Sequence, residues 1–400
     1  MKNQHDIIIV GIQPWDIQIG SNCKNIALEL SKTNRVLYVN SPLDHITKIR
    51  NRKSEQVKRR KEILKNKNNS LQKINDNLFV LDPQTTIFSI NWLPSRLFKF
   101  INKINNKLIA SEIKKALVKL NFIDPIIFND SDMFRSFHLK ELLNADTYVY
   151  YTRDNLMTVP YWKKHGTYFE PELIKKSDVV VGNSPHLINK FKAYNKNAFY
   201  IGQGCDFSLF NANTIYTKPN DLENVKGKII GYTGLLSSRR LDIHLIKEIA
   251  INHPDKTIVL IGQEEDCFKS SELHKLENIL FLGNKTPEEL PRYISFFDIC
   301  INPQSVNELT ISNYPRKIDE YMALGKNVVA TFTPTMEIFK DHVFLARDSY
   351  EFNQMIAEAI TNDNEYKKTE RINFALNHTW EASVNELMYA INTKNQNGNT

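Results

Sequence analysis

The segment that decides the fold is Asn313-Tyr-Pro-Arg-Lys-Ile-Asp-Glu-Tyr-Met-Ala-Leu-Gly-Lys-Asn-Val-Val-Ala-Thr331. Pro315 suits the first turn of a helix, where the missing N–H of proline costs nothing, and apolar residues then recur at helical spacing. Gly325 suits the end of that helix because glycine readily adopts the left-handed conformation found there. The run from Asn327 to Thr331 then has the composition of a buried strand. The segment therefore predicts a loop, a short helix and a strand, the repeating unit of an α/β fold.

The same segment carries groups that suit a phosphorylated ligand. Backbone N–H groups at the start of a helix attract anions, and Lys317 adds a cation there. Glu320 lies one turn further along and offers a carboxylate for ribose hydroxyls. Amides and a cation for a diphosphate, together with that carboxylate, predict a site for a sugar nucleotide.

The rest of the chain repeats the strand–helix pattern in two halves. A strand at 6–11, a helix at 23–33 and a strand at 35–40 begin the first half, an order that favours a doubly wound sheet. Helices are also predicted at 134–143 and, as a long amphipathic segment, at 92–120. We predict an N-terminal domain over 1–210, a linker over 211–226, a C-terminal domain over 227–375, and a terminal helix and tail over 376–400.

Composition narrows the class of protein. Four hundred residues, of which 42% are hydrophobic, suit two globular α/β domains. The four cysteines are scattered, so neither a metal site nor a redox motif is predicted, and a cytoplasmic location is favoured. No signal peptide is evident at the start of the chain, and no run approaches the length of a transmembrane helix.

Charge is distributed unevenly along the chain. The first 205 residues contain 32 Lys and Arg against 18 Asp and Glu, a net charge of +14, whereas the remainder has a net charge of −7. Basic residues concentrate at 48–67 and along one face of 92–119. These segments are either solvated helix faces, with 48–67 alternatively a mobile insertion, or a surface for an anionic partner. Nucleic-acid binding is not predicted, because the chain lacks an aromatic RNA-reading motif and a helix-turn-helix pattern.

The segment at 313–331 resembles the donor-binding motif of the GT-B glycosyltransferases of family 4, which runs roughly Pro-x-Lys-x-x-Glu-Tyr-x-Ala-x-Gly-x-x-Val-Val-x-Thr. The matching residues are Pro315, Lys317, Glu320, Tyr321, Ala323, Gly325, Val328, Val329 and Thr331. The alternative is an ordinary strand–helix unit, in which a glycine after a helix and a valine-rich strand are common. The resemblance implies the GT-B fold, in which two Rossmann-like doubly wound domains face each other across a cleft. It also implies that the terminal helix packs back on the first domain.

The resemblance assigns the donor side of the site to the C-terminal domain. The loop 231–242 would supply Gly234 and a phosphate-binding arginine, either Arg239 or Arg240. Gly262 and Gly283 each follow a strand, where ligands of open α/β sheets bind. The remaining implied donor contacts are Leu282 and Gly283 for the base, and Ser312, Asn313, Tyr314, Lys317 and Glu320 for the diphosphate and ribose. Many family members carry a second Glu where this chain has Ser312, so the stereochemical course stays open.

The acceptor side would lie in the N-terminal domain. Trp15 and the run Gly20, Ser21 and Asn22 follow the first strand, where the family has its acceptor-side loop. Asp154 follows another strand and is the candidate for a catalytic role near the acceptor, and His165 comes soon after. The alternatives are that Asp154 has no role in the site and that His165 is a surface histidine in a loop.

Taken together, the residues and the resemblance predict a metal-independent glycosyltransferase. It would move a sugar from a nucleotide-diphosphate donor to a hydroxyl of a glycan or lipid-linked acceptor, in cell-surface polysaccharide biosynthesis. Arg240 and Lys317 would neutralise the leaving diphosphate and Glu320 would orient the ribose, and no cofactor is expected. One alternative is a catalytically degenerate sugar-nucleotide or polysaccharide-binding member of an assembly complex, and another is a GT-B sugar-nucleotide epimerase. The sugar, base, acceptor, linkage and oligomeric state stay open.

A lipid-linked acceptor would also give the basic segments a partner. In that case 48–67 and 92–119 would contact the anionic inner face of the membrane, and Trp92, Phe98 and Phe100 would enter the lipid interface.

Overall fold

The computed structural model describes residues 4–17, 20–66 and 70–397. It divides the chain into two compact units, one of Met1–Gly202 with Ser383–Thr400 and the other of Gln203–Ala382. The first crossing between units thus precedes residue 210, and the return crossing follows residue 375. The segment 211–226 belongs to the second unit.

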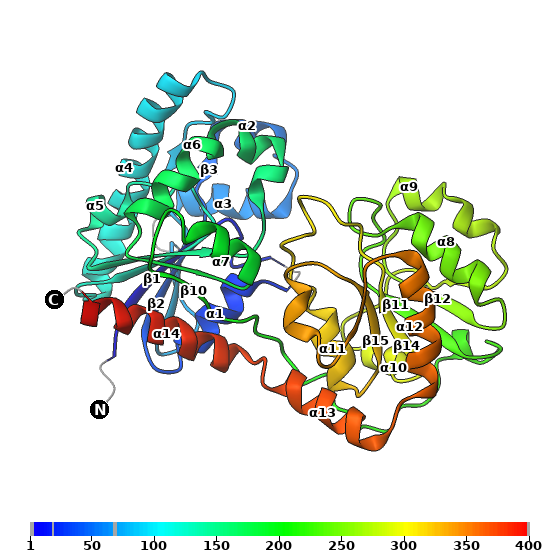
Figure 1. Cartoon of the computed structure of the whole chain (residues 1–400). Helices are drawn as coiled ribbons and strands as arrows, with labels where there is room; N and C mark the ends of the chain where they lie inside the picture. The colour runs from blue at the N-terminus through cyan, green and yellow to red at the C-terminus, as the bar shows by residue number, and fades with distance from the viewer. Residues whose placement is uncertain (1–3, 18–19, 67–69, 398–400) are drawn as a thin grey trace. The chain divides into compact units, whose positions relative to one another are not determined.

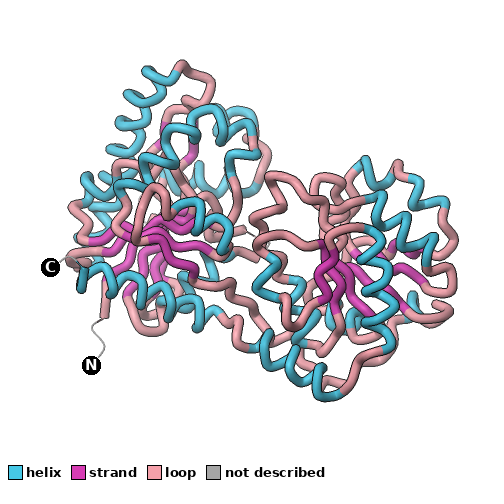
Figure 2. The backbone as a smooth tube through the Cα atoms, in the orientation of Figure 1, coloured by secondary structure: helices cyan, strands magenta, loops and turns pink. Residues whose placement is uncertain are grey.

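The first unit is built on an eight-stranded sheet with the order β10-β9-β8-β7-β1-β2-β5-β4 (Figure 2). Its strands are β1 (Asp6–Gly11), β2 (Arg35–Val39), β4 (Leu71–Lys73), β5 (Leu78–Leu81), β7 (Ile126–Asp130), β8 (Thr147–Thr152), β9 (Val179–Gly182) and β10 (Ala198–Tyr200). All pair in parallel except the edge strand β4, which is antiparallel to β5. Ile8 in the fully buried β1 pairs with Leu37 on one side and Ile127 on the other. The order reverses between β1 and β7, the position at which open sheets bind ligands beyond the carboxyl ends of their strands.

Helices cover this sheet, and the longest of those described begins directly after Pro94. They are α1 (Asn22–Leu30), α2 (His45–Arg50), α3 (Glu55–Lys65), α4 (Ser95–Leu120), α5 (Leu139–Leu143), α6 (Pro160–Lys176) and α7 (Pro185–Phe191). A small pair of strands, β3 (Leu43–Asp44) and β6 (Thr86–Ile87), flanks α2. Pro94 has extended backbone just before α4, and Asn121 ends the helix in the left-handed conformation. The amphipathic helix predicted at 92–120 is therefore confirmed, three residues shorter at its start.

The helix α6 was not expected from the sequence, because it contains both Gly166 and Pro171. Proline inside a helix removes a hydrogen bond, and glycine is a poor helix former. Packing explains the glycine, because a Cβ atom at Gly166 would lie 2.6 and 2.7 Å from the side chains of Met157 and Met133. Close packing in the core therefore outweighs the weak helical propensity of this segment.

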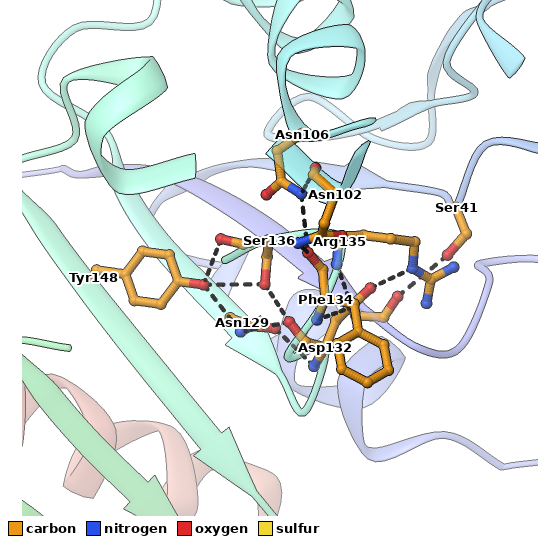
Figure 3. Close-up of polar contacts among 10 residues, drawn as sticks. Ser41, Asn102, Asn106, Asn129, Asp132, Phe134, Arg135, Ser136 and Tyr148 are labelled. Atoms are coloured by element: carbon orange, nitrogen blue, oxygen red, sulfur yellow. Dashed lines mark hydrogen bonds and ion pairs between the residues drawn. The ribbon is translucent and has the colours of Figure 1, made fainter. Parts of the chain in front are cut away.

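The predicted helix at 134–143 was wrong for its first part, because α5 begins only at Leu139. The residues after β7 instead form a turn that side chains hold in place (Figure 3). The Asp132 carboxylate accepts from the N–H groups of Phe134 and Arg135 at 3.2 and 2.9 Å. Two asparagines of α4 donate to the Phe134 carbonyl at 3.0 and 2.9 Å. These bonds occupy the backbone groups that a helix would have used.

The second unit has a six-stranded, wholly parallel sheet with the order β13-β12-β11-β14-β15-β16. Its strands are β11 (Ile229–Thr233), β12 (Thr257–Ile261), β13 (Ile279–Phe281), β14 (Ile299–Asn302), β15 (Val328–Thr331) and β16 (Phe344–Ala346). Its helices are α8 (Ile243–Asn252), α9 (Asp266–Lys269), α10 (Leu290–Ile294), α11 (Lys317–Ala323), α12 (Ser349–Thr361) and α13 (Glu365–Leu376). One apolar core lies on each side of this sheet, as the doubly wound prediction requires.

The helix α14 (Trp380–Asn397) carries the chain back from the second unit into the first (Figure 1). Within the first unit, Lys394 Nζ lies 3.3 Å from an Asp178 carboxylate oxygen at the start of β9. Its residues from Ser383 to Lys394 thus belong to the first unit.

Candidate functional site

Three glycines bring the loops at the carboxyl edge of the second sheet into close contact. Gly234, Gly262 and Gly283 follow β11, β12 and β13, and all three have positive φ. The Gly234 N–H donates to the Ile261 carbonyl at 2.8 Å, and the Gly262 N–H donates to the Gly283 carbonyl at 2.8 Å. A Cβ atom at Gly262 would lie 1.8 Å from the Gly234 carbonyl oxygen. Glycine is therefore required at 262, and the edge presents backbone rather than side chains.

Lys317, the first residue of α11, points its ammonium group at this edge. Its Nζ donates to the Tyr232 hydroxyl and lies 3.8 Å from the centre of the Tyr232 ring. A Cβ atom at Gly234 would lie 2.6 Å from the same Nζ, so a side chain there would displace the lysine. The pKa of Lys317 is lowered to about 7, mainly by burial; the Glu320 carboxylate opposes this shift and the charge of Arg240 adds to it. The lysine is thus poised between its charged and neutral forms near neutral pH.

The structure brings Arg240 and Glu320 to the same place. The charge of Arg240 acts on both Lys317 and Tyr232, whereas Arg239 is exposed and its carbonyl accepts from the Asn307 side chain at 3.0 Å. Burial raises the pKa of Glu320, against the opposing charges of Arg316 and Lys317. Among the residues that the structure describes, Arg240, Lys317 and Glu320 form no ion pair.

The predicted loop 312–314 contributes less than expected. The Asn313 N–H donates to the Thr310 carbonyl at 2.9 Å, so the prediction that this amide is free for a diphosphate was wrong. The Tyr314 hydroxyl donates to Asp319 at 2.7 Å. Ser312 is buried, and its hydroxyl has no hydrogen-bond partner among the described residues. Leu282 donates its N–H to the Leu260 carbonyl at 3.0 Å.

The opposite face of α11 carries a buried polar cluster that the sequence analysis did not find. Asp319 is fully buried, and its carboxylate lies 2.7 Å from His378 Nδ1 and accepts from Tyr314. The Cys205 thiol lies 3.5 Å from the same carboxylate, and its N–H donates to the His378 carbonyl at 2.9 Å. Asp319 therefore ties α11 to the two segments by which the chain enters and leaves this unit. The sequence signal that could have pointed to this cluster is the acidic residue Asp319 next to Glu320 on a short helix.

In the first unit, the predicted acceptor-side residues surround the carboxyl ends of β1, β2 and β8. The Trp15 N–H donates to Asn40 at 2.7 Å, and its ring meets Tyr38 edge-on at 5.3 Å. Ser21 caps α1, and the Asn22 side chain donates to the Tyr151 hydroxyl at 3.2 Å. Gly20 is exposed just before Ser21.

Asp154 follows β8 and is partly exposed. Its neighbour Arg153 donates to the fully buried Asp130 at 3.1 Å. Burial raises the pKa of Asp130, and the Arg153 guanidinium opposes that rise. The Asp130 carboxylate is therefore buried and paired with Arg153 below the edge of the sheet. Asp154 is the more accessible carboxylate next to this pair.

His165 is not the surface histidine that the sequence analysis offered as an alternative. It is buried in α6, stacked on Phe98 at 3.9 Å, with Nε2 3.1 Å from the Asn91 carbonyl. Burial lowers the pKa of His165. These contacts place the imidazole against α4 as a packing group.

Part of the basic segment 48–67 also reaches the first sheet's edge. Arg59 and Arg60 of α3 lie 3.3 and 3.0 Å from the Asp16 carboxylate. Both also lie 3.7 Å from Asp82, which accepts from Asn40 at 2.7 Å. The expectation that this segment is solvated or mobile throughout was therefore wrong for these two arginines.

Within the described ranges, no group of three or more His, Cys, Asp and Glu side chains is arranged to hold a metal ion.

Comparisons with known proteins show what the chain is similar to. Residues 227–362 match the family model described as glycosyl transferases group 1. Over 230 residues the chain is 28% identical to the "Putative teichuronic acid biosynthesis glycosyltransferase TuaH" of Bacillus subtilis (strain 168), a match that covers 55% of this chain and 58% of that relative. The alignment thus spans little more than half of the relative's length.

Solved structures match over nearly the whole chain. Anabaena HepE in complex with UDP has a TM-score of 0.65 at 14% identity and covers 97% of this chain and 100% of its own. Sucrose-phosphate synthase of Thermosynechococcus elongatus has a TM-score of 0.65 at 14% identity, covering 98% and 99%. A trehalose 6-phosphate synthase of Burkholderia multivorans has a TM-score of 0.67 at 10% identity, covering 99% and 100%. At these identities the likeness establishes the fold.

Proposed function

We propose that this chain, which has the GT-B fold and whose residues 227–362 match the family model of the group 1 glycosyl transferases, transfers a sugar from a nucleotide-diphosphate donor to a hydroxyl group. The observation that carries the proposal is the cluster of Arg240, Lys317 and Glu320 against the glycine loops of the second sheet. Two cations without ion-pair partners in the described chain, beside exposed backbone, suit a diphosphate.

Each residue of the cluster has a role in this proposal. Arg240 and Lys317 hold the diphosphate and stabilise the charge that develops on it as the sugar leaves. Arrival of the diphosphate favours the protonated form of Lys317, whose pKa is about 7 without ligand. Glu320 accepts hydrogen bonds from ribose hydroxyls, and the backbone around Gly262, Leu282 and Gly283 receives the base.

The relatives suggest which donor to test first. HepE is described in complexes with UDP and with UDP-glucose, and TuaH is named for teichuronic acid biosynthesis. We therefore propose a UDP-sugar donor and a glycan or lipid-linked acceptor in the assembly of a cell-surface polysaccharide.

The acceptor side is assigned to the first unit. We propose that Asp154 approaches the acceptor hydroxyl, with Trp15, Gly20, Ser21 and Asn22 forming the surrounding loop. Asp154 is favoured over Asp130 because Asp130 is fully buried and paired with Arg153. We assign no substrate contact to His165, since its ring packs on Phe98.

A lipid-linked acceptor would bring the protein to an anionic membrane, which the basic segments 48–67 and 92–119 would contact. Across the described residues, every helix is too short or too polar to cross a bilayer.

The direct test is thermal stability in the presence of UDP-, GDP- and ADP-sugars, with and without EDTA. A donor at 100 times its Kd should add about 2.7 kcal/mol to the free energy of unfolding. A shift with UDP-sugars that EDTA does not change supports metal-independent donor binding, and the absence of a shift with any donor contradicts the proposal.

The test then separates transfer from its alternatives. The bound donor is incubated with an acceptor preparation, and the sugar products are followed by nuclear magnetic resonance. Release of nucleoside diphosphate with a new glycosidic bond indicates a transferase. A donor that stays intact indicates the degenerate binding protein, and a sugar inverted at one carbon while still attached to its nucleotide indicates the epimerase.

A further inference from the structure

The first unit exposes large apolar side chains around the start of α4. Trp92 is 69% exposed, Phe100 67% and Ile49 72%. We call the group the aromatic face and define it as Ile46, Ile49, Phe88, Trp92, Leu97, Phe100 and Tyr161. Soluble proteins rarely leave a contiguous patch of this kind without a partner.

Hydrogen bonds and ring contacts join the segments that carry the aromatic face. The Ile46 N–H donates to the Ser89 hydroxyl at 3.1 Å, and the rings of His45 and Phe88 lie 5.4 Å apart. The Asn91 side chain donates to the Tyr161 carbonyl at 3.1 Å. Figure 1 shows α2, β3 and α6 grouped at one end of this unit. These contacts thus bring segments that are distant in sequence next to one another.

The most exposed aromatic side chain of the face, Trp92, has its polar group hydrogen-bonded within the protein. The Trp92 indole N–H donates to the Ser89 carbonyl at 3.0 Å within its own loop. The rest of the ring is apolar and lies mostly in water. An indole held in this way is suited to the boundary between water and lipid.

Positive charge predominates in the segments that carry the aromatic face. The segments 45–53, 88–103 and 155–169 contain nine Lys and Arg residues and no Asp or Glu. Within the described chain, none of the nine forms an ion pair. Three acids directly flank these segments: Asp44, Asp154 and Glu170. Asp44 caps α2, where it accepts from Ile46 and Thr47, and Glu170 accepts from the buried Tyr150 hydroxyl.

We propose that the aromatic face docks on an anionic lipid surface. Its apolar side chains would enter the interface, and the surrounding cations would meet lipid phosphates, the two attractions that together hold a peripheral protein on a membrane. The positive charge of these segments complements an anionic lipid surface. The inference rests on the proposed function, because a lipid-linked acceptor would require contact with a membrane.

The structure also narrows the surface predicted from sequence. Phe98 is buried against His165 and cannot enter lipid, so that part of the prediction was wrong. Arg59 and Arg60 are paired with Asp16 and do not belong to the face. The lysines at the far end of α4 are excluded too, because a helix of this length spans roughly 39 Å.

Sedimentation with vesicles tests the docking. The full chain should bind vesicles of equal parts phosphatidylglycerol and phosphatidylcholine, and stay in solution with phosphatidylcholine alone. The variant Trp92→Ser/Phe100→Ser should partition at least about tenfold more weakly. The matched control Tyr350→Ser/Tyr366→Ser removes two exposed aromatics of the second unit and should bind as the wild type does.

Charge is tested on the same vesicles. Lys163→Gln/Lys164→Gln should weaken binding several-fold, and Lys114→Gln/Lys119→Gln at the far end of α4 should weaken it less. Equal losses in the two lysine pairs would overturn the assignment to this face. So would undiminished binding of the Trp92→Ser/Phe100→Ser variant, or failure of the wild type to bind either vesicle.

The donor thermal shift, measured on the same samples, separates this inference from the proposed function. A protein that binds UDP-sugar but no vesicle overturns the docking alone. Loss of vesicle binding in Trp92→Ser/Phe100→Ser with an unchanged donor shift supports the docking, because the two surfaces then act independently.

Discussion

The two sheets differ in whether the charged side chains at the carboxyl ends of their strands have ion-pair partners. In the first unit, arginines at the edge are paired with carboxylates: Arg59 and Arg60 with Asp16 and Asp82, Arg153 with Asp130, and Arg135 with Asp132. In the second unit, Arg240, Lys317 and Glu320 have no ion-pair partner in the described ranges. This is so although the chain after residue 205 has a net charge of −7.

We infer from this difference that the edge of the second sheet is the one that binds an ionic ligand. Charges that are buried without partners are costly, so a site that keeps them gains when a ligand supplies the opposite charge. A diphosphate would do this at the second edge. The first edge has already neutralised its own charges, which suits an acceptor that offers an uncharged hydroxyl group.

The largest expected effect comes from breaking a pair at the first edge. Arg153→Leu leaves the buried Asp130 without its cation and should lower the free energy of unfolding by about 3 kcal/mol, measured by denaturant titration. The folded pKa of Asp130, already raised by burial, rises further without Arg153. The folded state then holds a proton that the unfolded state releases, so stability should fall as pH rises above about 4.

The double variant Arg153→Leu/Asp130→Asn is the control and should recover most of the lost stability. Donor affinity should be unchanged in both variants. A loss of donor affinity without a loss of stability would contradict the contrast between the edges.

The next largest effect is at Lys317. Lys317→Ala should weaken nucleoside-diphosphate binding by about 100-fold, or about 2.7 kcal/mol, measured by calorimetry. Removing a desolvated cation should leave the melting temperature unchanged or raised. The matched control Lys269→Ala removes an exposed lysine of the same unit. Equal affinities in the wild type and Lys317→Ala would remove this residue from the donor site.

Glu320→Gln should have a smaller and more selective effect. Loss of a charged acceptor for the ribose hydroxyls should weaken nucleoside-diphosphate binding by about tenfold. Pyrophosphate, which has no ribose, should bind as tightly as before. Glu337→Gln, at an exposed position of the same unit, serves as the control. A parallel loss for both ligands would mean that Glu320 acts on the diphosphate instead.

The smallest effect is a proton count. At pH 8, a lysine whose pKa is about 7 is mostly neutral, and a bound diphosphate should raise that pKa. Binding should therefore take up a fraction of a proton that approaches one, visible as a dependence of the calorimetric heat on the ionisation enthalpy of the buffer. Lys317→Met should abolish this dependence, and identical heats in all buffers for the wild type would refute the proposed recharging.

The sequence by itself determined most of the elements and the resemblance to the group 1 glycosyl transferases. Apolar runs and helical spacing specified the strands and long helices, and the segment 313–331 identified the GT-B fold and the group 1 resemblance, both now confirmed. These signals are local, because a strand or a helix is encoded by neighbours in sequence. Local rules failed where packing outweighed them, as in α6 with its Gly166 and Pro171.

Only the tertiary structure decided which charges meet. Three such meetings arise when distant strands bring their ends to one edge: the proximity of Arg240 to Lys317, the contact of Lys317 with Tyr232 across 85 residues, and the pairing of Arg60 with Asp16 across 44. The same holds for Phe98. The sequence predicted that this side chain enters lipid, but it is buried in the core. Periodicity specifies the face on which a side chain lies, but its partner is fixed only when the sheets and helices pack.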